Sequence, residues 1–139
     1  MRATPSRIVL DTNIVVSRAL VPVSIRGRVV SKALAECVVL ASTATIRELE
    51  EVIVREKLDR MTPRWKRLEA IRLYGLELTV CEVVDIVTVC RDPKDNMILA
   101  LALSGHADLI VTGDKDLLCL HPWRGIAILS PADYLRLGS

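Results

Sequence analysis

The chain reads Ala-Asp-Leu-Ile-Val-Thr-Gly-Asp-Lys-Asp-Leu-Leu over residues 107–118, and this segment is a clear indication of the fold class. Its apolar residues predict a short buried strand over Asp108–Thr112, which is followed almost at once by Asp114. Arg7–Leu10 has the same character and runs directly into Asp11. Continuous apolar runs of this kind are typical of strands in a parallel sheet that helices cover on both faces.

The remaining periodic segments alternate between strands and helices. Further strands are predicted at Val38–Ala41, Leu76–Val84 and Ile126–Leu129. Helices are predicted at Ile14–Leu20, at Ile25–Cys37, from the start signals Ser42, Thr43 and Thr45 through Arg60, at Pro63–Tyr74, at Pro93–Ser104 and after Ser130-Pro131. This alternation predicts one α/β domain over residues 1–139, with a mostly parallel central sheet and helices on both faces.

The composition predicts an aliphatic core and a cytoplasmic protein. Hydrophobic residues make up 51% of the 139 residues, whereas aromatic residues make up 3% and Phe is absent. The four cysteines, Cys37, Cys81, Cys90 and Cys119, contain no C-x-x-C pair, which argues against a zinc knuckle or a disulfide framework and fits a reducing cytoplasm. Residues 1–7 form no apolar signal segment, and charges break every longer apolar run, so we expect no membrane span.

Acidic residues stand where two of the predicted strands end. In an open parallel α/β sheet, ligands bind beyond the carboxyl ends of the strands, where Asp11 and Asp114 both lie. An aspartate at the end of a buried strand needs a positive or hydrogen-bonding neighbour. Each residue alone has an equally good structural role as the cap of the loop or helix that follows.

A third acid lies in the segment Arg91-Asp92-Pro93-Lys94-Asp95-Asn96. Asp92 fits the N-cap of the following helix, Pro93 its first residue, and Asp95 its first turn, where a carboxylate favours the helix dipole. The same turn can aim the Asp95 carboxylate outward from the sheet edge. The structural and the functional role of Asp95 therefore do not exclude each other.

Glu48 is the least distinctive of the candidate acids. Thr45 and Glu48 have the spacing of a capping box. On a helical projection, Glu48 lies on the border of the apolar stripe, which suits a half-buried ligand. Glu51 lies further out and reads as a surface ion pair with Arg55. Periodicity alone favours Glu48 over Glu50 only slightly.

A cluster of three or four carboxylates is unfavourable without a cation, because each carboxylate raises the pKa of the others. Mg²⁺ or Mn²⁺ prefers such oxygen ligands. Phosphodiester hydrolysis needs what this ion supplies, an activated nucleophile and stabilised charge on the phosphate. His106 and His121 have no spacing that indicates ligation, and we interpret them as structural or exposed. The chain has no Gly-rich phosphate loop, G-x-S-x-G elbow or H-E-x-x-H motif.

Together these motifs resemble the PIN-domain proteins, in particular the bacterial and archaeal PIN toxins (VapC-like) of toxin–antitoxin pairs. The resemblance extends from Arg7 to about Leu137. Its most specific parts are residues 107–118, quoted above, and residues 92–102, Asp-Pro-Lys-Asp-Asn-Met-Ile-Leu-Ala-Leu-Ala. The opening Asp11-Thr12-Asn13 is useful only in combination with them.

The resemblance implies a PIN-like fold and a set of site residues. The family's acidic quartet falls on Asp11, Glu48, Asp95 and Asp114, and in the family it binds one or two metal ions and cuts RNA. Asp11, Asp95 and Asp114 would hold Mg²⁺ or Mn²⁺. Glu48 would complete the site as a ligand or as the residue that orients the attacking water. Asp116 matches a further acid that would assist or replace Asp114.

The resemblance also implies supporting residues and partners. Asn13 and Thr112 match the polar positions that usually support the acids. Asn96 stands where relatives often carry another acid, which lowers the local negative charge and favours one metal ion over two. Small PIN toxins generally act as homodimers or higher oligomers and are silenced by a cognate antitoxin protein. The implied partners are therefore RNA, an antitoxin and a second copy of the chain.

The charge distribution is uneven, although the net charge is only +2. Residues 1–72 carry 14 Lys and Arg against 8 Asp and Glu, whereas residues 73–139 carry 5 against 9. The densest basic group is Arg60, Arg64, Lys66, Arg67 and Arg72. In a ribonuclease these residues would contact phosphates, but the same pattern fits a solvated helix face.

The sequence thus favours a metal-dependent endoribonuclease, the toxin of a toxin–antitoxin pair, over two alternatives. One is a non-catalytic PIN-fold module that binds RNA or protein, which an incomplete acid set would favour. The other is a phosphatase of the haloacid-dehalogenase type, suggested by Asp11-Thr12 and Gly113-Asp114. That class needs a second aspartate where Asn13 stands.

Overall fold

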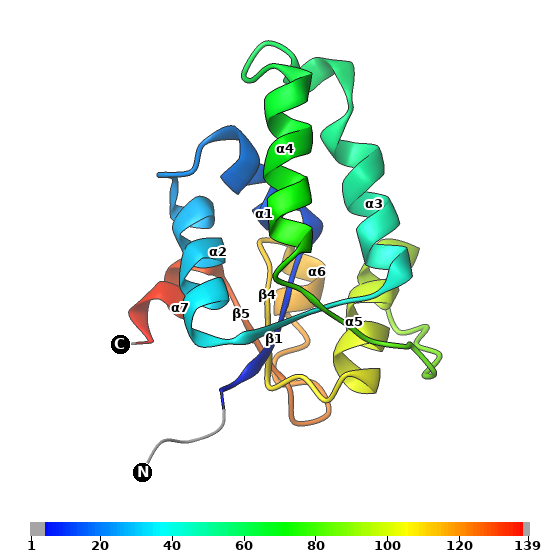
Figure 1. Ribbon diagram of the computed structural model, residues 1–139. Coiled ribbons are helices and arrows are strands. Elements are labelled where there is room, and N and C mark those ends of the chain that lie inside the picture. Colours follow the sequence, from blue (N-terminus) through cyan, green and yellow to red (C-terminus); the bar gives the residue numbers. More distant parts are fainter. Residues whose placement is uncertain (1–4, 138–139) are drawn as a thin grey trace.

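The computed structural model describes residues 5–137 and is built around a parallel β-sheet (Figure 1). The strands are β1 (Arg7–Leu10), β2 (Val38–Ala41), β3 (Thr79–Val80), β4 (Leu109–Val111) and β5 (Ala127–Leu129). They lie in the order β3-β2-β1-β4-β5, and every neighbouring pair is parallel. The predicted α/β class is confirmed. Residues 1–4 and 138–139 of the predicted domain lie outside the described residues.

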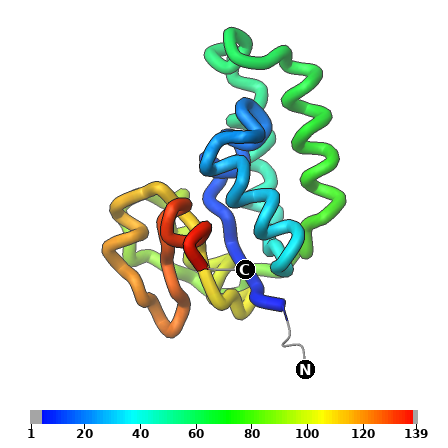
Figure 2. Tube along the Cα trace, turned by 90° about the vertical axis from the view of Figure 1, so that its left-hand side faces the viewer, coloured from blue at the N-terminus to red at the C-terminus, as the bar shows by residue number. Residues whose placement is uncertain are grey.

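Helices cover both faces of this sheet, as predicted. They are α1 (Thr12–Leu20), α2 (Ile25–Glu36), α3 (Thr43–Ile53), α4 (Arg64–Gly75), α5 (Pro93–Ser104), α6 (Lys115–Leu118) and α7 (Pro131–Arg136), with a 3-10 helix η1 (Glu56–Leu58). The core on one face contains residues of α1 to α4 and α7, and the core on the other contains residues of α5 and α6. Figures 1 and 2 show α3 and α4 as a helical hairpin that extends beyond the sheet.

The central strands send alternate side chains into the two cores. Ile8 and Leu10 of β1 belong to the core beneath α1 and α2, whereas Val9 belongs to the core beneath α5. In β4, Ile110 pairs with Val9 and shares its core. A shift of register by one residue would move every side chain into the opposite core. The register of β1 and β4, and hence the start of the loops that follow them, is therefore fixed by burial.

The strand order creates a switch point between β1 and β4. From β1 the chain proceeds to β2 and β3 on one side of the sheet, and it returns to β4 and β5 on the other. The segments that leave β1 and β4 therefore start side by side and lead to helices on opposite faces. Such switch points leave a crevice at the carboxyl ends of the strands, where ligands bind. Asp11 and Asp114 both lie at this crevice.

The helix predicted from Ser42 through Arg60 ends earlier, at Ile53, so the prediction is wrong for its last part. Val54 leaves the helical conformation with φ −95° and ψ 3°, and the chain turns through η1 into α4. Here Arg67 Nε of α4 donates a hydrogen bond of 2.8 Å to the carbonyl oxygen of Ile53. The Arg67 side chain thus provides a hydrogen bond for a carbonyl group at the end of α3. The periodicity of the α3 segment carries no information about this partner, because it belongs to another helix.

The strand predicted over Leu76–Val84 is wrong in length, because β3 covers only Thr79–Val80. Beyond β3, the backbone N–H groups of Val84 and Asp85 donate to the hydroxyl oxygen of Ser104 in α5, each at 3.1 Å. The Ser104 hydroxyl also donates to the Asp85 carboxylate at 2.7 Å. From Val84 on, the chain is therefore held by a side chain of α5 rather than by a neighbouring strand.

Arg67 is buried, although the sequence placed it in the basic group expected to contact phosphates. Its side chain is 0% exposed. The guanidinium donates to the carbonyl oxygens of Ile53 and Thr62 and, at 2.9 Å, to Oδ1 of Asp59. These bonds join α4 to the end of α3 and to the turn after η1. A phosphate-binding role for Arg67 is therefore wrong, because no phosphate can reach it.

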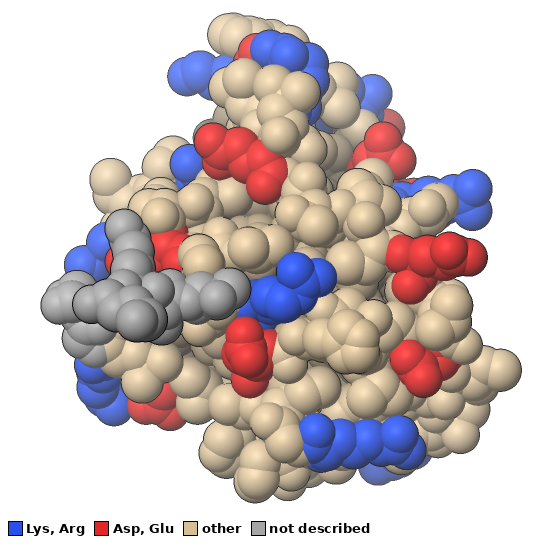
Figure 3. Space-filling model, turned by 60° about the horizontal axis from the view of Figure 1, so that its bottom comes forward, with Lys and Arg blue, Asp and Glu red and all other residues tan. Residues whose placement is uncertain are grey.

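Charged side chains are interspersed on the face of the molecule drawn in Figure 3. Among the described residues on that face, Lys and Arg lie next to Asp and Glu over largely uncharged surface. The surplus of positive charge in the first half of the sequence therefore does not form a single patch there. Within residues 5–137, no helix combines the length and the apolar character needed to cross a bilayer.

Replacing Arg67 by Ala is expected to lower the free energy of unfolding by about 2–4 kcal/mol, because it leaves a cavity and removes three hydrogen bonds. Urea denaturation followed by circular dichroism measures the change. The matched control is Lys66→Ala, at an exposed position of the same helix, which should change stability by less than about 0.5 kcal/mol. Equal effects of the two substitutions would contradict the structural role of Arg67.

Candidate metal centre

Thr112 joins the two strand ends that carry the first pair of acids. Its side chain is 0% exposed, and its hydroxyl donates to Oδ2 of Asp11 at 2.7 Å. The same hydroxyl oxygen accepts from the backbone N–H of Asp114 at 3.0 Å. The backbone N–H of Asp11 in turn donates to the carbonyl oxygen of Val111 at 3.0 Å. One buried hydroxyl thus fixes the Asp11 carboxylate and the loop that presents Asp114.

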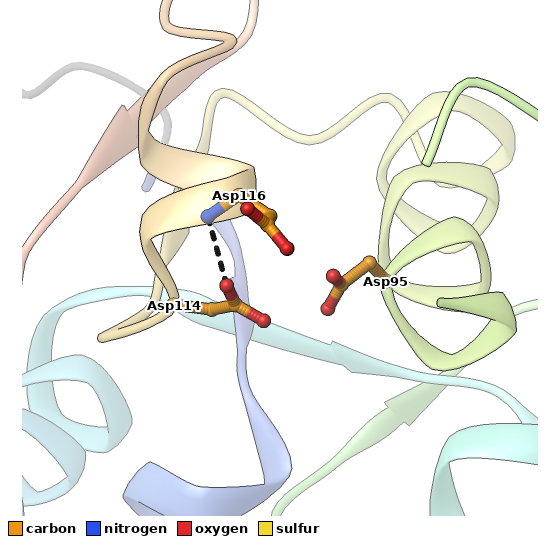
Figure 4. Close-up of side chains that lie close together, drawn as sticks. All are labelled: Asp95, Asp114 and Asp116. Atoms are coloured by element: carbon orange, nitrogen blue, oxygen red, sulfur yellow. Dashed lines mark hydrogen bonds between the residues drawn. The ribbon is translucent and has the colours of Figure 1, made fainter. Parts of the chain in front are cut away.

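Three carboxylates gather in front of these strand ends, and Figure 4 shows them. Asp95 comes from the first turn of α5, Asp114 is the N-cap of α6, and Asp116 lies in the first turn of α6. One oxygen of each of these residues lies within 4.8 Å of the others. In Figure 4 the carboxylates of Asp95 and Asp114 point toward each other across the gap between α5 and α6. We call Asp95, Asp114 and Asp116 the acidic trio.

Asp95 is held in the trio by a well-formed helix start. Asp92 is the N-cap of α5, and its side chain accepts from the backbone N–H of Lys94 at 2.9 Å, while Pro93 occupies the first helical position. The predicted arrangement of Asp92, Pro93 and Asp95 is confirmed by this helix. Asp95 itself makes no capping bond. Its side chain is therefore free to face Asp114.

The pKa of Asp95 is raised to about 7. The largest cause is burial, since the residue is only 6% exposed, and the next is the neighbouring carboxylate of Asp114. Asp92 and Asp11 add smaller electrostatic contributions in the same direction. Near neutral pH the metal-free centre is therefore partly protonated, whereas an ordinary surface aspartate would have lost its proton.

The residues present fit a hard divalent cation. The trio offers carboxylate oxygens that lie close together and that repel one another without a positive charge between them. Mg²⁺ and Mn²⁺ prefer oxygen ligands of this kind. Cys90 lies nearby, but burial and the carboxylates of the trio raise the pKa of its thiol, so the thiol stays protonated rather than becoming a thiolate ligand. The donor set is therefore one of oxygen atoms.

Asp11 and Glu48 stand outside the trio. Among the described residues, neither belongs to a group whose ligand atoms all lie within 4.8 Å. Asp11 is nonetheless close enough to raise the pKa of Asp95, and its carboxylate does not cap α1. Glu48 is half-buried on α3, which packs against α1 and α5. The capping box predicted for Thr45 and Glu48 is formed instead by Ser42 and Thr45, so Glu48 is not used as a cap.

The two predicted supporting asparagines have different environments. Asn13 is exposed in the first turn of α1. The side-chain amide of Asn96 accepts from the backbone N–H of Cys90 and donates to its carbonyl oxygen, both at 2.9 Å. Asn96 therefore anchors the segment that leads into α5 and uses both polar atoms for that purpose. It stabilises the helix that carries Asp95.

Asp116 is the residue whose place in the trio the sequence indicated least clearly. Its backbone N–H donates to Oδ1 of Asp114 at 2.8 Å, which folds the short helix α6 around the cap (Figure 4). The sequence signal was the spacing Asp-Lys-Asp after a buried strand, which fits a capped helix start with a second acid in its first turn. His121, by contrast, accepts from the backbone N–H of Ile128 at 2.9 Å, and His106 is exposed.

The fold and this site define an α/β protein with a carboxylate centre at the switch point of its sheet, and comparison with known proteins agrees. A family model described as PIN domain matches residues 7–116. The chain belongs to the PIN domain family. It is also 29% identical over 116 residues to the uncharacterized protein MJ1680 of Methanocaldococcus jannaschii, an alignment that covers 82% of this chain and 74% of that protein.

Two solved structures share the fold. One is a chain of VapBC2 from Rickettsia felis, in a structure bound to a DNA fragment from the VapBC2 promoter. Its TM-score is 0.62 at 11% sequence identity, and the alignment covers 89% of this chain and 98% of the VapBC2 chain. PAE2754 from Pyrobaculum aerophilum has a TM-score of 0.62 at 16% identity. That alignment covers 92% of this chain and 85% of the PAE2754 chain. At these identities the likeness concerns the fold alone.

Thr112→Val is expected to weaken Mn²⁺ binding by roughly tenfold to a hundredfold, as for other residues that orient metal ligands. The substitution keeps the shape of the side chain but releases the Asp11 carboxylate and the Asp114 loop. Isothermal titration calorimetry with Mn²⁺ measures the affinity. Thr112→Ser keeps the hydroxyl and serves as the control. Equal affinity for the Val and Ser variants would contradict the role of the hydroxyl.

Asp95→Asn is expected to change how stability depends on pH in the metal-free protein. The folded pKa of about 7 lies above the unfolded value of about 4, so the folded state binds the proton more tightly. Between these two values, stability falls as the pH rises, and this contribution is lost above pH 7. The Asn variant lacks this fall in stability. The melting temperature of the variant minus that of the wild type should therefore increase from pH 5 to pH 8. Thermal denaturation in the presence of a chelator measures both melting temperatures at each pH. Parallel plots of melting temperature against pH for the two proteins would contradict the prediction.

Proposed function

We propose that the chain is a Mg²⁺- or Mn²⁺-dependent endoribonuclease that hydrolyses RNA phosphodiester bonds, working as a single domain over residues 1–139. The observation that carries the proposal is the acidic trio at the switch point of the sheet, with oxygens within 4.8 Å of one another. Membership of the PIN domain family supports it, since the trio contains two acids of the family's quartet. Metal-dependent phosphodiester hydrolysis is the chemistry that such a centre serves best.

The side chains of the centre have distinct roles in this proposal. Asp95 and Asp114, with Asp11 and Asp116 beside them, are the residues that would hold the ion. When bound, the ion neutralises the developing charge and lowers the pKa of water. A bound cation would favour the ionised form of Asp95, so the Asp95 carboxylate would serve as a ligand without its proton. Glu48, half-buried on the neighbouring α3, adds a ligand or orients the attacking water.

We favour one metal ion over two. The position after Asp95 is Asn96, whose amide oxygen is engaged by the backbone N–H of Cys90. This side chain supplies no additional negative charge, and its polar atoms face the loop before α5. A second ion would therefore lack the oxygen ligand that an acid at this position provides in relatives.

We also propose that the chain is a cytoplasmic toxin that pairs with a cognate antitoxin and forms homodimers. Its similarity in fold to a chain of VapBC2 supports this part of the proposal. The four cysteines are free thiols, as a reducing compartment requires. Co-expression of this chain with the product of the adjacent gene, followed by purification of the complex, would test the antitoxin pairing directly.

Asp95→Asn and Asp114→Asn are each expected to lower the rate of RNA cleavage by about 10³-fold, because each removes a carboxylate that holds the ion. The assay incubates purified protein with a labelled structured RNA and with a single-stranded RNA, in Mg²⁺, in Mn²⁺ and in chelator. Glu48→Gln and Asp11→Asn, measured in the same assay, show which of the outer acids the reaction needs.

The matched control is Asp133→Asn, which removes the same charge from an exposed ion pair with Arg136 on α7. It should cut RNA at the wild-type rate. A wild-type protein that binds RNA but cleaves none with either ion would overturn the nuclease and support the non-catalytic binding module. Cleavage that survives both in Asp95→Asn and in a double variant of Asp114→Asn and Asp116→Asn would point to a contaminating nuclease.

A further inference from the structure

We infer that Arg26 binds a phosphate of the substrate beside the acidic trio, an inference that rests on the proposed RNA hydrolysis. Arg26 lies in the first turn of α2, and its guanidinium occupies the space directly over Gly113. A Cβ built on Gly113 would lie 2.7 Å from Nη2 and 3.4 Å from Cζ of Arg26. Gly113 stands between Thr112 and Asp114, so a cation packs against the loop that carries the acids.

Rigid neighbours determine where Arg26 lies. Ser24 caps α2, and its hydroxyl accepts from the backbone N–H of Gly27 at 3.1 Å. Gly27 in turn lies against the backbone carbonyl of Pro22, so closely that a Cβ at this position would overlap it. Backbone atoms cannot yield as a flexible side chain can. The start of α2 is therefore fixed, and it brings the Arg26 side chain to Gly113.

Arg26 has no structural partner that explains its position. Among residues 5–137, its guanidinium has no carboxylate within the 4.0 Å of an ion pair and donates no hydrogen bond. The first turn of a helix also disfavours a cation, because the amide dipoles direct their positive ends there. By contrast, each of the three guanidinium nitrogens of Arg67 donates a hydrogen bond within the protein. The donors of Arg26 are free for a ligand.

The chemistry of these free donors fits a phosphate. A guanidinium binds phosphate oxygens through two parallel N–H···O hydrogen bonds. Arg26 is half-buried, and it is the one charged residue in the lining of an open, mainly apolar hollow formed with Ser17, Leu20, Val21, Ser24, Ile25 and Met61, so a ligand can reach it from solvent. A phosphodiester at the acidic trio would have Arg26 on the side of Gly113. There the guanidinium would stabilise the charge that builds up on the phosphate oxygens.

Arg26→Gln is expected to lower kcat/KM for RNA cleavage by about 100-fold. Arg26→Lys keeps the charge but loses the paired hydrogen bonds, so it should lower kcat/KM by only about tenfold. Arg28→Gln, an exposed position on the same helix, is the matched control and should keep the wild-type value. Mn²⁺ affinity, measured by calorimetry, should stay the same in all three variants, because Arg26 does not hold the ion.

Gly113→Ala tests the same inference without removing a charge. The new Cβ meets the far end of the flexible Arg26 side chain, so it should displace the guanidinium rather than the backbone. We expect it to reproduce the cleavage defect of Arg26→Gln, and to add nothing further in the double variant. Defects that multiply in the double variant would overturn the inference.

Binding to uncleaved RNA separates this inference from the proposed function. In the otherwise wild-type protein with Mg²⁺, which keeps the trio intact, the affinity for a fluorescent single-stranded oligoribonucleotide with nuclease-resistant phosphorothioate linkages is measured by anisotropy at several salt concentrations. Adding Arg26→Gln should reduce the slope of log affinity against log salt by about 0.7, the value for one lost phosphate contact. An unchanged slope would overturn the role of Arg26. A wild-type protein that cuts no RNA would overturn the nuclease itself.

Discussion

The parallel pairing of β1 with β4 is the constraint on which the rest of the site depends. It brings Asp11 and Thr112, which are 101 residues apart in the sequence, within a hydrogen bond of 2.7 Å. The pairing is held because alternate side chains of both strands are buried in two separate cores. No local shift of either strand can therefore separate the acids without exposing apolar surface to water. The stability of the two cores is what keeps the carboxylates together.

Burial of Asp95 shows how the fold sustains an arrangement that is unfavourable by itself. Its carboxylate sits at the start of α5, where the following residues Ile98, Leu99 and Leu101 are almost fully buried. Their apolar contacts, together with the capped start of the helix at Asp92, hold α5 in place while the acid faces another negative charge. The free energy lost by repulsion in the trio is thus offset by packing elsewhere in the same helix. Functional sites commonly carry such local costs.

The sequence predicted those parts of the fold and site that short-range patterns specify. The strands around Ile8 and Ile110 and the helix start at Asp92 are set by burial and capping within a few residues. The end of α3 at Ile53 and the short β3 were missed, because a side chain from another helix satisfies the backbone in each case. The contact of Arg26 with Gly113 was likewise invisible, since it joins two segments with no shared pattern. What could not be predicted is the choice of distant partners.

The balance of charge around the trio links metal binding to substrate binding. Three carboxylates without a cation would repel a phosphodiester, and the retained proton on Asp95 relieves that repulsion only in part. A divalent ion and the guanidinium of Arg26 together carry as many positive charges as the trio carries negative ones. The proposed ion and Arg26 would thus offset the charge of the trio, and Arg26 would face the phosphate from the side of Gly113. In the proposed nuclease, the ion and Arg26 would therefore have to act together to hold a phosphodiester beside the acids.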